Sequence, residues 1–224
     1  MFAGHVGAGL ALSRADRSMN PGVLVFAAML TDFLLWSFVL LGWESVSIPA
    51  DYAASHQMHF TFPYSHSMAA SVALSLTAAA IAYLWYRAPG RGNMRPAVLV
   101  GAAVLSHWLL DALVHVPEIP LAGGTSHKVG LGLWQHMALA LGIESLVLLA
   151  GLWMYLAGAP TSGGRKWGMG ILGLFVLGST VAGMTVAPAP PSVATVAVSS
   201  LITIVVVTSL AAWFGAVQTA QRSS

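Results

Sequence analysis

The sequence contains no cysteine and little charge. Without cysteine, disulfides and thiolate metal ligands are excluded, so a metal ion could be held only by imidazole and carboxylate groups. Charged residues make up 7% of the chain and hydrophobic residues 57%, a composition typical of a polytopic helical membrane protein. The nine basic residues are scattered among short loops, so we expect no nucleic-acid partner.

Two common catalytic motifs are also missing. The chain has no Gly-x-Ser-x-Gly sequence, which would place a nucleophilic serine on a sharp turn. It also has no glycine-rich loop ending in lysine of the kind that cradles nucleotide phosphates. The sequence therefore gives no support to a serine hydrolase or to a nucleotide-driven enzyme.

Long apolar runs separated by short polar segments occupy most of the chain. A helix needs about 20 apolar residues to cross a bilayer. Six runs meet this requirement: 21–43, 68–86, 96–116, 133–156, 168–187 and 196–217. The apolar segment 1–13 is too short to span, and its arginines follow it, so we predict a retained half-length helix and not a signal peptide. The predicted class is an all-α, polytopic membrane protein with six transmembrane helices and a short N-terminal half-helix.

The basic residues predict an orientation, because cytoplasmic loops are rich in Lys and Arg. If the N-terminus is cytoplasmic, only Lys128 lies outside. The other basic residues then share the inner side: Arg14, Arg17, Arg87, Arg91, Arg95, Arg165, Lys166 and Arg222. We expect a multi-pass protein of a bacterial-type inner (plasma) membrane with both termini in the cytoplasm and the lipid bilayer as its partner.

The ionisable residues predict two parts within one membrane domain. We expect residues 1–157 to form a helical core that contains the metal site, and residues 158–224 to form a two-helix hydrophobic extension. The last two spans contain no ionisable residue. They could serve as scaffold or as a surface for another membrane protein, and the sequence does not separate these alternatives.

A polar stripe lies inside the third apolar run. His107, Asp111 and His115 are spaced four residues apart, which places them within about 80° of one face of a helix. A His and an Asp one turn apart can bind one cation. They can equally form a hydrogen-bonded pair that joins two helices, so the stripe alone leaves both interpretations open.

Three carboxylates are predicted deep in the membrane without a basic partner at the same depth. Two of them, Asp32 and Glu144, lie about 16 Å inside their spans, at the same depth as His107. A charged group at mid-bilayer costs about 2.5–3.5 kcal/mol, so protonation or a bound cation must neutralise Asp32, Asp111 and Glu144. The neighbouring imidazoles favour a divalent metal ion over a proton relay.

The order of these short motifs resembles a known family. Gly4-His5-Val6-Gly7, Leu30-Thr31-Asp32, Tyr64-Ser65-His66-Ser67 and the His107-x-x-x-Asp111 helix are similar to motifs of the inner-membrane metal-dependent hydrolases. That family is distantly similar to zinc-dependent phospholipase C. The resemblance covers residues 1–145 and leaves out the last two spans.

The resemblance implies a metal-dependent hydrolase and a set of site residues. The implied ligands of a divalent metal are His5, Asp32, His66, His107 and Asp111, with Asp32 also a catalytic base. His115, His136 and Glu144 would form a second metal site or surround the first. Zinc is the favoured ion, and manganese or iron also suits nitrogen and oxygen ligands. The expected substrate is a phosphoester or lipid-like molecule reached from the outer face.

Other classes of function remain open at this stage. A haem-binding or electron-transfer subunit could use His107 and His136 as axial ligands, but the three carboxylates would then be unexplained. An ion carrier could use the same carboxylates for transport. A non-catalytic accessory subunit of a membrane complex could retain the metal site without activity.

Overall fold

The computed structural model describes residues 1–87 and 94–216, so Arg91 and Arg222 of the charge comparison lie outside the described residues. The helices are α1 (Phe2–Ser13), α2 (Pro21–Leu40), α3 (Tyr52–Ser55), α4 (Met68–Tyr86), α5 (Arg95–Val114), α6 (Met137–Leu156), α7 (Gly163–Thr185) and α8 (Val193–Gly215), with a 3-10 turn at Leu133–His136. Within the described residues, six helices are long and apolar enough to cross a membrane, and α1 is a shorter apolar helix. The predicted all-α class and helix pattern are confirmed.

Two helix ends differ from the predicted boundaries. Helix α7 begins at Gly163, earlier than the predicted start at 168, because the Ser162 side chain accepts a hydrogen bond from the backbone N–H of Arg165. Helix α5 ends at Val114, and His115 has the extended conformation (ψ 146°) shortly before Pro117. His115 therefore lies just beyond the helix that was predicted to carry it.

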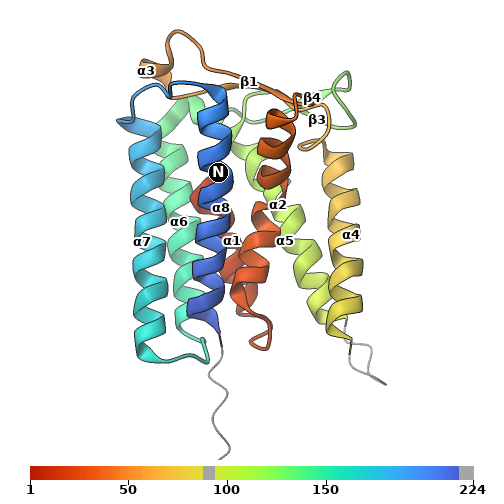
Figure 1. The fold of residues 1–224 in the computed structure, drawn as a ribbon, viewed down its shortest axis with the longest axis vertical. Coiled ribbons are helices and arrows are strands. Elements are labelled where there is room, and N and C mark those ends of the chain that lie inside the picture. The colour runs from red at the N-terminus through yellow and green to blue at the C-terminus, as the bar shows by residue number, and fades with distance from the viewer. Residues whose placement is uncertain (88–93, 217–224) are drawn as a thin grey trace, which may run out of the picture.

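The short helix α1 lies in the centre of the bundle, packed between α2 and α6 (Figure 1). Two glycines permit this close packing. A Cβ atom at Gly7 would lie 2.5 Å from the Cα of Leu148, and one at Gly9 would lie 2.6 Å from the Cα of Val25. Around this centre, α4 packs on α5, α8 packs on α2, and α7 packs on both α6 and α8.

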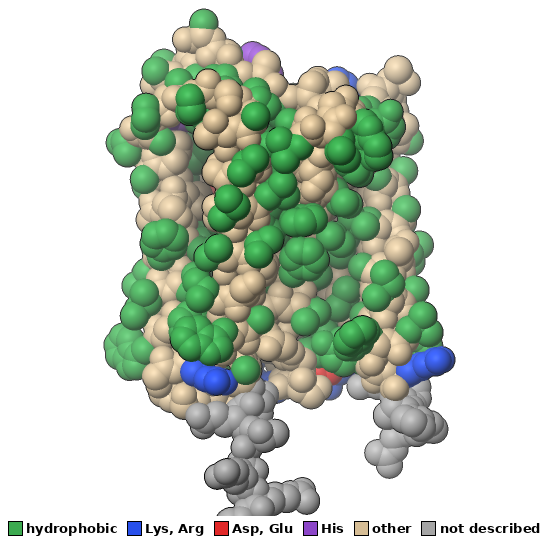
Figure 2. All heavy atoms as spheres, in the orientation of Figure 1, with side chains coloured by type: hydrophobic (Ala, Val, Ile, Leu, Met, Phe, Trp, Pro, Cys, Tyr) green, Lys and Arg blue, Asp and Glu red, His purple; other side chains and the backbone are tan. Residues whose placement is uncertain are grey.

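Two short antiparallel strand pairs lie at one end of the bundle, which we call the strand end (Figure 1). They are β1 (Ser45–Ser47) with β2 (His59–Thr61), and β3 (Ile119–Pro120) with β4 (Lys128–Val129). The sequence suggested only loops here. Hydrophobic side chains cover the length of the helices, and most visible Lys and Arg side chains gather at the opposite end, which we call the basic end (Figure 2).

Candidate metal centre

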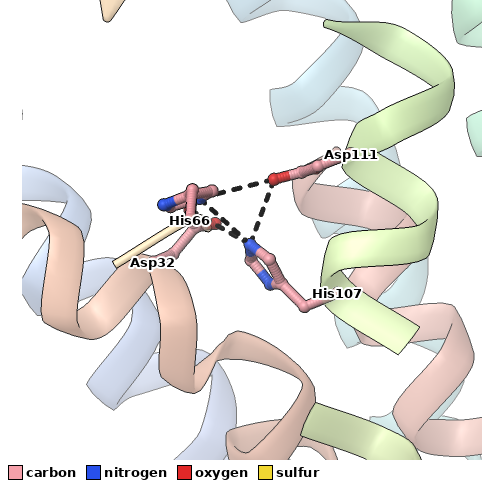
Figure 3. Close-up of side chains that lie close together, drawn as sticks. All are labelled: Asp32, His66, His107 and Asp111. Atoms are coloured by element: carbon pink, nitrogen blue, oxygen red, sulfur yellow. Dashed lines mark hydrogen bonds and ion pairs between the residues drawn. The ribbon is translucent and has the colours of Figure 1, made fainter. Parts of the chain in front are cut away.

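Four side chains from three parts of the chain converge inside the bundle (Figure 3). Asp32 comes from α2, His66 from the segment before α4, and His107 and Asp111 from α5. One potential ligand atom from each residue lies within 4.8 Å of all the others. His66, His107 and Asp111 are buried, whereas the Asp32 side chain is 19% exposed. The group is therefore closed on one side and accessible at Asp32.

The separations within this group suit a metal ion. The Nε2 atom of His107 lies 3.1 Å from Asp111 Oδ2 and 3.6 Å from Asp32 Oδ1. The Nε2 atom of His66 lies 3.4 Å and 3.5 Å from the same two oxygens. The two Nε2 atoms are 3.3 Å apart. Ligands bonded to a tetrahedral zinc ion at about 2.0–2.2 Å lie about 3.3–3.6 Å from one another, so the residues fit such an ion.

The tautomer of His107 follows from its backbone contact. Its Nδ1 atom lies 2.8 Å from the carbonyl oxygen of Ala28, a group that can only accept a hydrogen bond. Nδ1 must therefore carry a proton and donate it. In the neutral ring the Nε2 atom then has a free lone pair, which points toward Asp32, His66 and Asp111. This is the form in which imidazole binds a metal.

A hydrogen-bonded chain fixes the orientation of His66 in the same way. The Ser65 hydroxyl donates to Glu44 Oε2 at 2.6 Å, because an ionised carboxylate can only accept. With its single proton used, the hydroxyl accepts a hydrogen bond from His66 Nδ1 at 2.7 Å. The neutral ring of His66 thus also directs a lone pair on Nε2 into the cluster. Backbone N–H groups of Tyr64 and Ser65 donate to Glu44 Oε1 and hold the carboxylate in place.

Glu44 is a site residue that the sequence analysis missed. It is 4% exposed and lies immediately before β1, where strand pairing with β2 brings the segment of Ser65 and His66 beside it. The one indication in the sequence was an acidic residue in a loop with few charged residues. Without the strand pairing, nothing in the sequence connects Glu44 to Ser65.

Lone pairs and negative charge therefore face one another on the Oδ2 side of Asp111, while the Met1 amino group offsets charge from the Oδ1 side. Two nitrogen lone pairs and two carboxylates face one another, and this arrangement is favourable only when a proton or a metal cation lies between them. Burial lowers the pKa of the His66 imidazole, but the hydrogen bonds and charges of Asp111 and Asp32 outweigh burial and raise it to about 9. Protons and metal ions thus compete for this nitrogen, and the buried group could hold a metal ion.

His5 lies beside the four converging residues and contacts the other oxygen of Asp111. Its Nε2 atom is 3.1 Å from Asp111 Oδ1, and its ring stacks on His107 with the ring centres 3.8 Å apart. The amino group of Met1 also lies 3.1 Å from Asp111 Oδ1. Asp111 thus uses Oδ2 toward His66 and His107 and Oδ1 toward α1. His5, which the resemblance implied as a metal ligand, thus lies beside the four converging residues and contacts Asp111 and His107.

Of the three residues implied as a second metal site or as surroundings of the first, His115 contacts the cluster through Asp111. The Nε2 atom of His115 is 3.9 Å from Asp111 Oδ2, and its Nδ1 atom pairs with Glu118 Oε1 at 2.6 Å. The ring packs against Phe60, Phe62 and Trp134. His115 therefore adjoins the cluster from the strand end, although it lies outside α5.

His136 and Glu144, the other two residues implied around the site, are separated by a change in helical geometry. The turn at Leu133–His136 is 3-10 and α6 begins at Met137, with His136 at φ −121° and ψ 66°. This break leaves the His136 side chain exposed and outside the converging group. Glu144 is 4% exposed, faces the backbone N–H groups of Ala3 and Gly4, and has one oxygen, Oε1, without a hydrogen-bond partner.

A cavity adjoins the accessible side of the cluster. Its volume is about 450 Å³, within the range of small-ligand sites. Asp32 and Glu144 both line it, together with apolar side chains such as Phe2 and Trp36. A molecule in this cavity can therefore approach Asp32 while the other three residues stay buried.

A scan against protein-family models and searches among curated proteins and solved structures find no match for this chain. The resemblance to the inner-membrane metal-dependent hydrolases therefore depends on the quoted motifs alone.

Proposed function

We propose that the chain is a membrane-embedded hydrolase that depends on a divalent metal, with zinc favoured, and acts on a phosphoester or lipid-like substrate. The observation that carries this proposal is the four-residue cluster, closed by burial on one side and accessible to the cavity through Asp32. Asp32, His66, His107 and Asp111 would hold the ion. Four protein ligands would fill a tetrahedral zinc site, so catalysis would require the accessible ligand, Asp32, to give way to water or substrate.

The bound ion would supply Lewis-acid polarisation of the substrate and a water molecule acidic enough to attack at neutral pH. The protein's own residues would orient the ligands and accept the proton. Ala28 and the Glu44–Ser65 pair hold the two imidazoles with Nε2 facing inward. Asp32 has one oxygen toward the cluster and its side chain partly in the cavity, so its carboxylate can take a proton from an attacking water.

The distribution of charge supports access from outside the cell. Described basic side chains lie mainly at the basic end of the bundle, next to the helix termini of α1, α4, α5 and α7. With this end cytoplasmic, the strand end would face outward. Asp32 lies eight residues before the end of α2 at Leu40, about 12 Å below the strand end. A substrate would then reach Asp32 from the outer half of the membrane.

A hydrolysis assay on purified, reconstituted protein tests the proposal. We expect turnover in a panel of phosphoesters and lipid esters that stops with a chelator and returns with zinc or manganese. Asp32→Asn should abolish turnover, while Asp51→Asn, which changes an exposed loop acid, should not. Turnover that persists with chelator, or metal-loaded protein inactive toward every ester tested, would overturn the proposal.

A further inference from the structure

The cavity beside Asp32 is built largely by α7 and α8, which carry none of the four cluster residues. Helix α7 contributes Ser179, Thr180, Gly183 and Met184, and α8 contributes Val196, Ser199, Ser200, Thr203 and Ile204. Asp32 of α2 and Glu144 of α6 also line it. The cavity thus lies between α2 and α6 and the α7–α8 pair.

Part of the cavity wall is exposed on the side of the bundle. Ser179 on α7 and Ser199 and Thr203 on α8 line the cavity and are also exposed. Ser179 lies six residues before the end of α7 at Thr185, and Thr203 ten residues after the start of α8, about 9 and 15 Å from the strand end. Both helices are long and apolar enough to span, so these positions lie within the depth of the bilayer. An opening of the cavity between them would meet lipid at about the depth of Asp32.

Most hydroxyls on this side of the cavity are satisfied by their own helices. Ser179 donates to the carbonyl of Phe175, Ser199 to that of Val196, and Thr203 to that of Ser199. Such bonds allow a hydroxyl to face hydrocarbon without an unpaired donor. These side chains make this side of the cavity mildly polar without requiring water.

Two of the residues that line the cavity each have a buried polar atom without a partner. Thr180 Oγ1 and Glu144 Oε1 are both buried and unpaired in the described structure. An unpaired buried polar atom costs about 1–3 kcal/mol, so a ligand group that supplies a hydrogen bond at this position would be stabilised. Glu144, as a carboxylate, needs a donor such as a hydroxyl. No Lys or Arg is among the described residues that line the cavity.

We infer that the cavity binds a membrane glycerolipid that enters laterally between α7 and α8. Its acyl chain would lie along Trp36, Met184 and Ile204, and a head-group hydroxyl would donate to Glu144. The scissile ester would then reach Asp32. This approach of the ester to Asp32 is the one part of the inference that rests on the proposed hydrolase function. The two helices outside the cluster thereby become the substrate-recognition part of the protein.

Photo-crosslinking in lipid nanodiscs tests this inference with a readout other than turnover. The probe is phosphatidylglycerol with a diazirine in one acyl chain, and labelled peptides are identified by mass spectrometry. We expect labelling of the cavity-lining segments of α7 and α8 above the labelling of the outward face of α4, where Leu76 is 67% exposed and reports ordinary surrounding lipid.

Two glycines of α7 provide a matched pair of variants. A Cβ atom at either Gly183 or Gly178 would meet no atom within 4 Å, but Gly183 lines the cavity and Gly178 does not. Gly183→Phe should lower cavity labelling by roughly tenfold, equivalent to about 1.4 kcal/mol of binding. Gly178→Phe should leave it unchanged. Equal effects of the two variants, or labelling of the cavity no stronger than that of α4, would overturn the inference.

The head-group and catalytic parts are tested separately. A phosphatidylglycerol probe with both head-group hydroxyls methylated has the same charge but no hydroxyl donor and should label the cavity more weakly, and equal labelling would overturn the role of Glu144. Metal content is measured on the same samples. Cavity labelling in a protein that holds no metal would support lipid binding and overturn the hydrolase, whereas metal without cavity labelling would overturn only the lipid inference.

Discussion

Helices α2 and α5 are about as apolar as helices α7 and α8, but a larger share of their residues is buried inside the protein. The mean hydropathy of the most apolar windows is 2.2 and 1.9 in the first pair and 1.6 and 2.3 in the second. In the first pair, 44% and 50% of the window residues are buried inside the protein, against 22% in each of the second pair. Hydropathy therefore identifies the spans, but it does not say which of them form the interior.

The difference follows from the kinds of polar group that each pair carries. Asp32, His107 and Asp111 need partners from other segments, so α2 and α5 pack inside the bundle. Beyond the first turn of α7, the polar groups of α7 and α8 are hydroxyls, several of which bond to their own helices. The inner pair can therefore hold a charge-dependent site, while the outer pair can face lipid.

The largest effect is expected when the inner pair loses its central carboxylate. Asp111 contacts His5, His66 and His107, and removing one partner of a buried ion pair costs about 3–5 kcal/mol. Asp111→Asn should lower the free energy of unfolding by this amount, measured by tryptophan fluorescence during denaturation in detergent. Glu118→Gln removes a more exposed carboxylate and is the control. Equal stability of the two variants would contradict the central position of Asp111.

The second-largest effect on the free energy of unfolding is expected from adding one methyl group to a glycine, with a different result in an inner helix and in an outer helix. Gly7→Ala places a Cβ atom 2.5 Å from the Cα of Leu148, so α1 must shift, at a cost of about 1–3 kcal/mol. Gly178→Ala in α7 meets no atom within 4 Å and should be neutral or stabilising by up to about 1 kcal/mol. The same denaturation assay measures both. A stable Gly7→Ala variant would contradict the packing of α1 between α2 and α6.

A moderate effect on metal affinity is expected from the hydrogen bonds behind His66. Ser65→Ala breaks the chain from Glu44 to His66 and should weaken zinc binding about 10- to 100-fold, measured by competition with a chromogenic chelator. The control is Ser106→Ala, whose hydroxyl bonds only to the carbonyl of Ala103 although it precedes His107 in the chain. If both variants bind zinc like the wild type, the chain from Glu44 does not orient a ligand.

The smallest effect is expected on the lipid-facing side of α8. Thr203 is exposed and bonds to the carbonyl of Ser199. Thr203→Val should therefore change the free energy of unfolding by less than about 0.5 kcal/mol. A large loss of stability would show that this face packs against protein instead of lipid.

Helix periodicity and hydropathy predicted the residues that lie on helices. The spans, the half-helix, and the inward positions of Asp32, His107 and Asp111 follow from apolar length and from the cost of intramembrane charge. His66 was predicted from a short motif in a loop. The sequence could not reveal Glu44, because its contact with Ser65 depends on the pairing of β1 with β2.

The predicted positions were wrong where local backbone geometry departs from a regular helix. His136 was expected at or around the metal site, but it lies in the 3-10 turn before α6, is exposed and is not among the converging residues. His115 was expected within the helix, but α5 ends one residue earlier, at Val114. Both errors occur at the strand end, where short strands and prolines replace helical periodicity as the determinant of position.

The most direct test of the account is the metal content of the detergent-purified protein, measured by inductively coupled plasma mass spectrometry. The wild type should contain near-stoichiometric zinc, manganese or iron. His107→Ala and Asp111→Asn should lose it, whereas His127→Ala, which changes an exposed histidine at the strand end, should retain it. A wild type without bound metal after reconstitution, or variants of His107 and Asp111 that keep their metal, would contradict the assignment of this cluster as a metal centre.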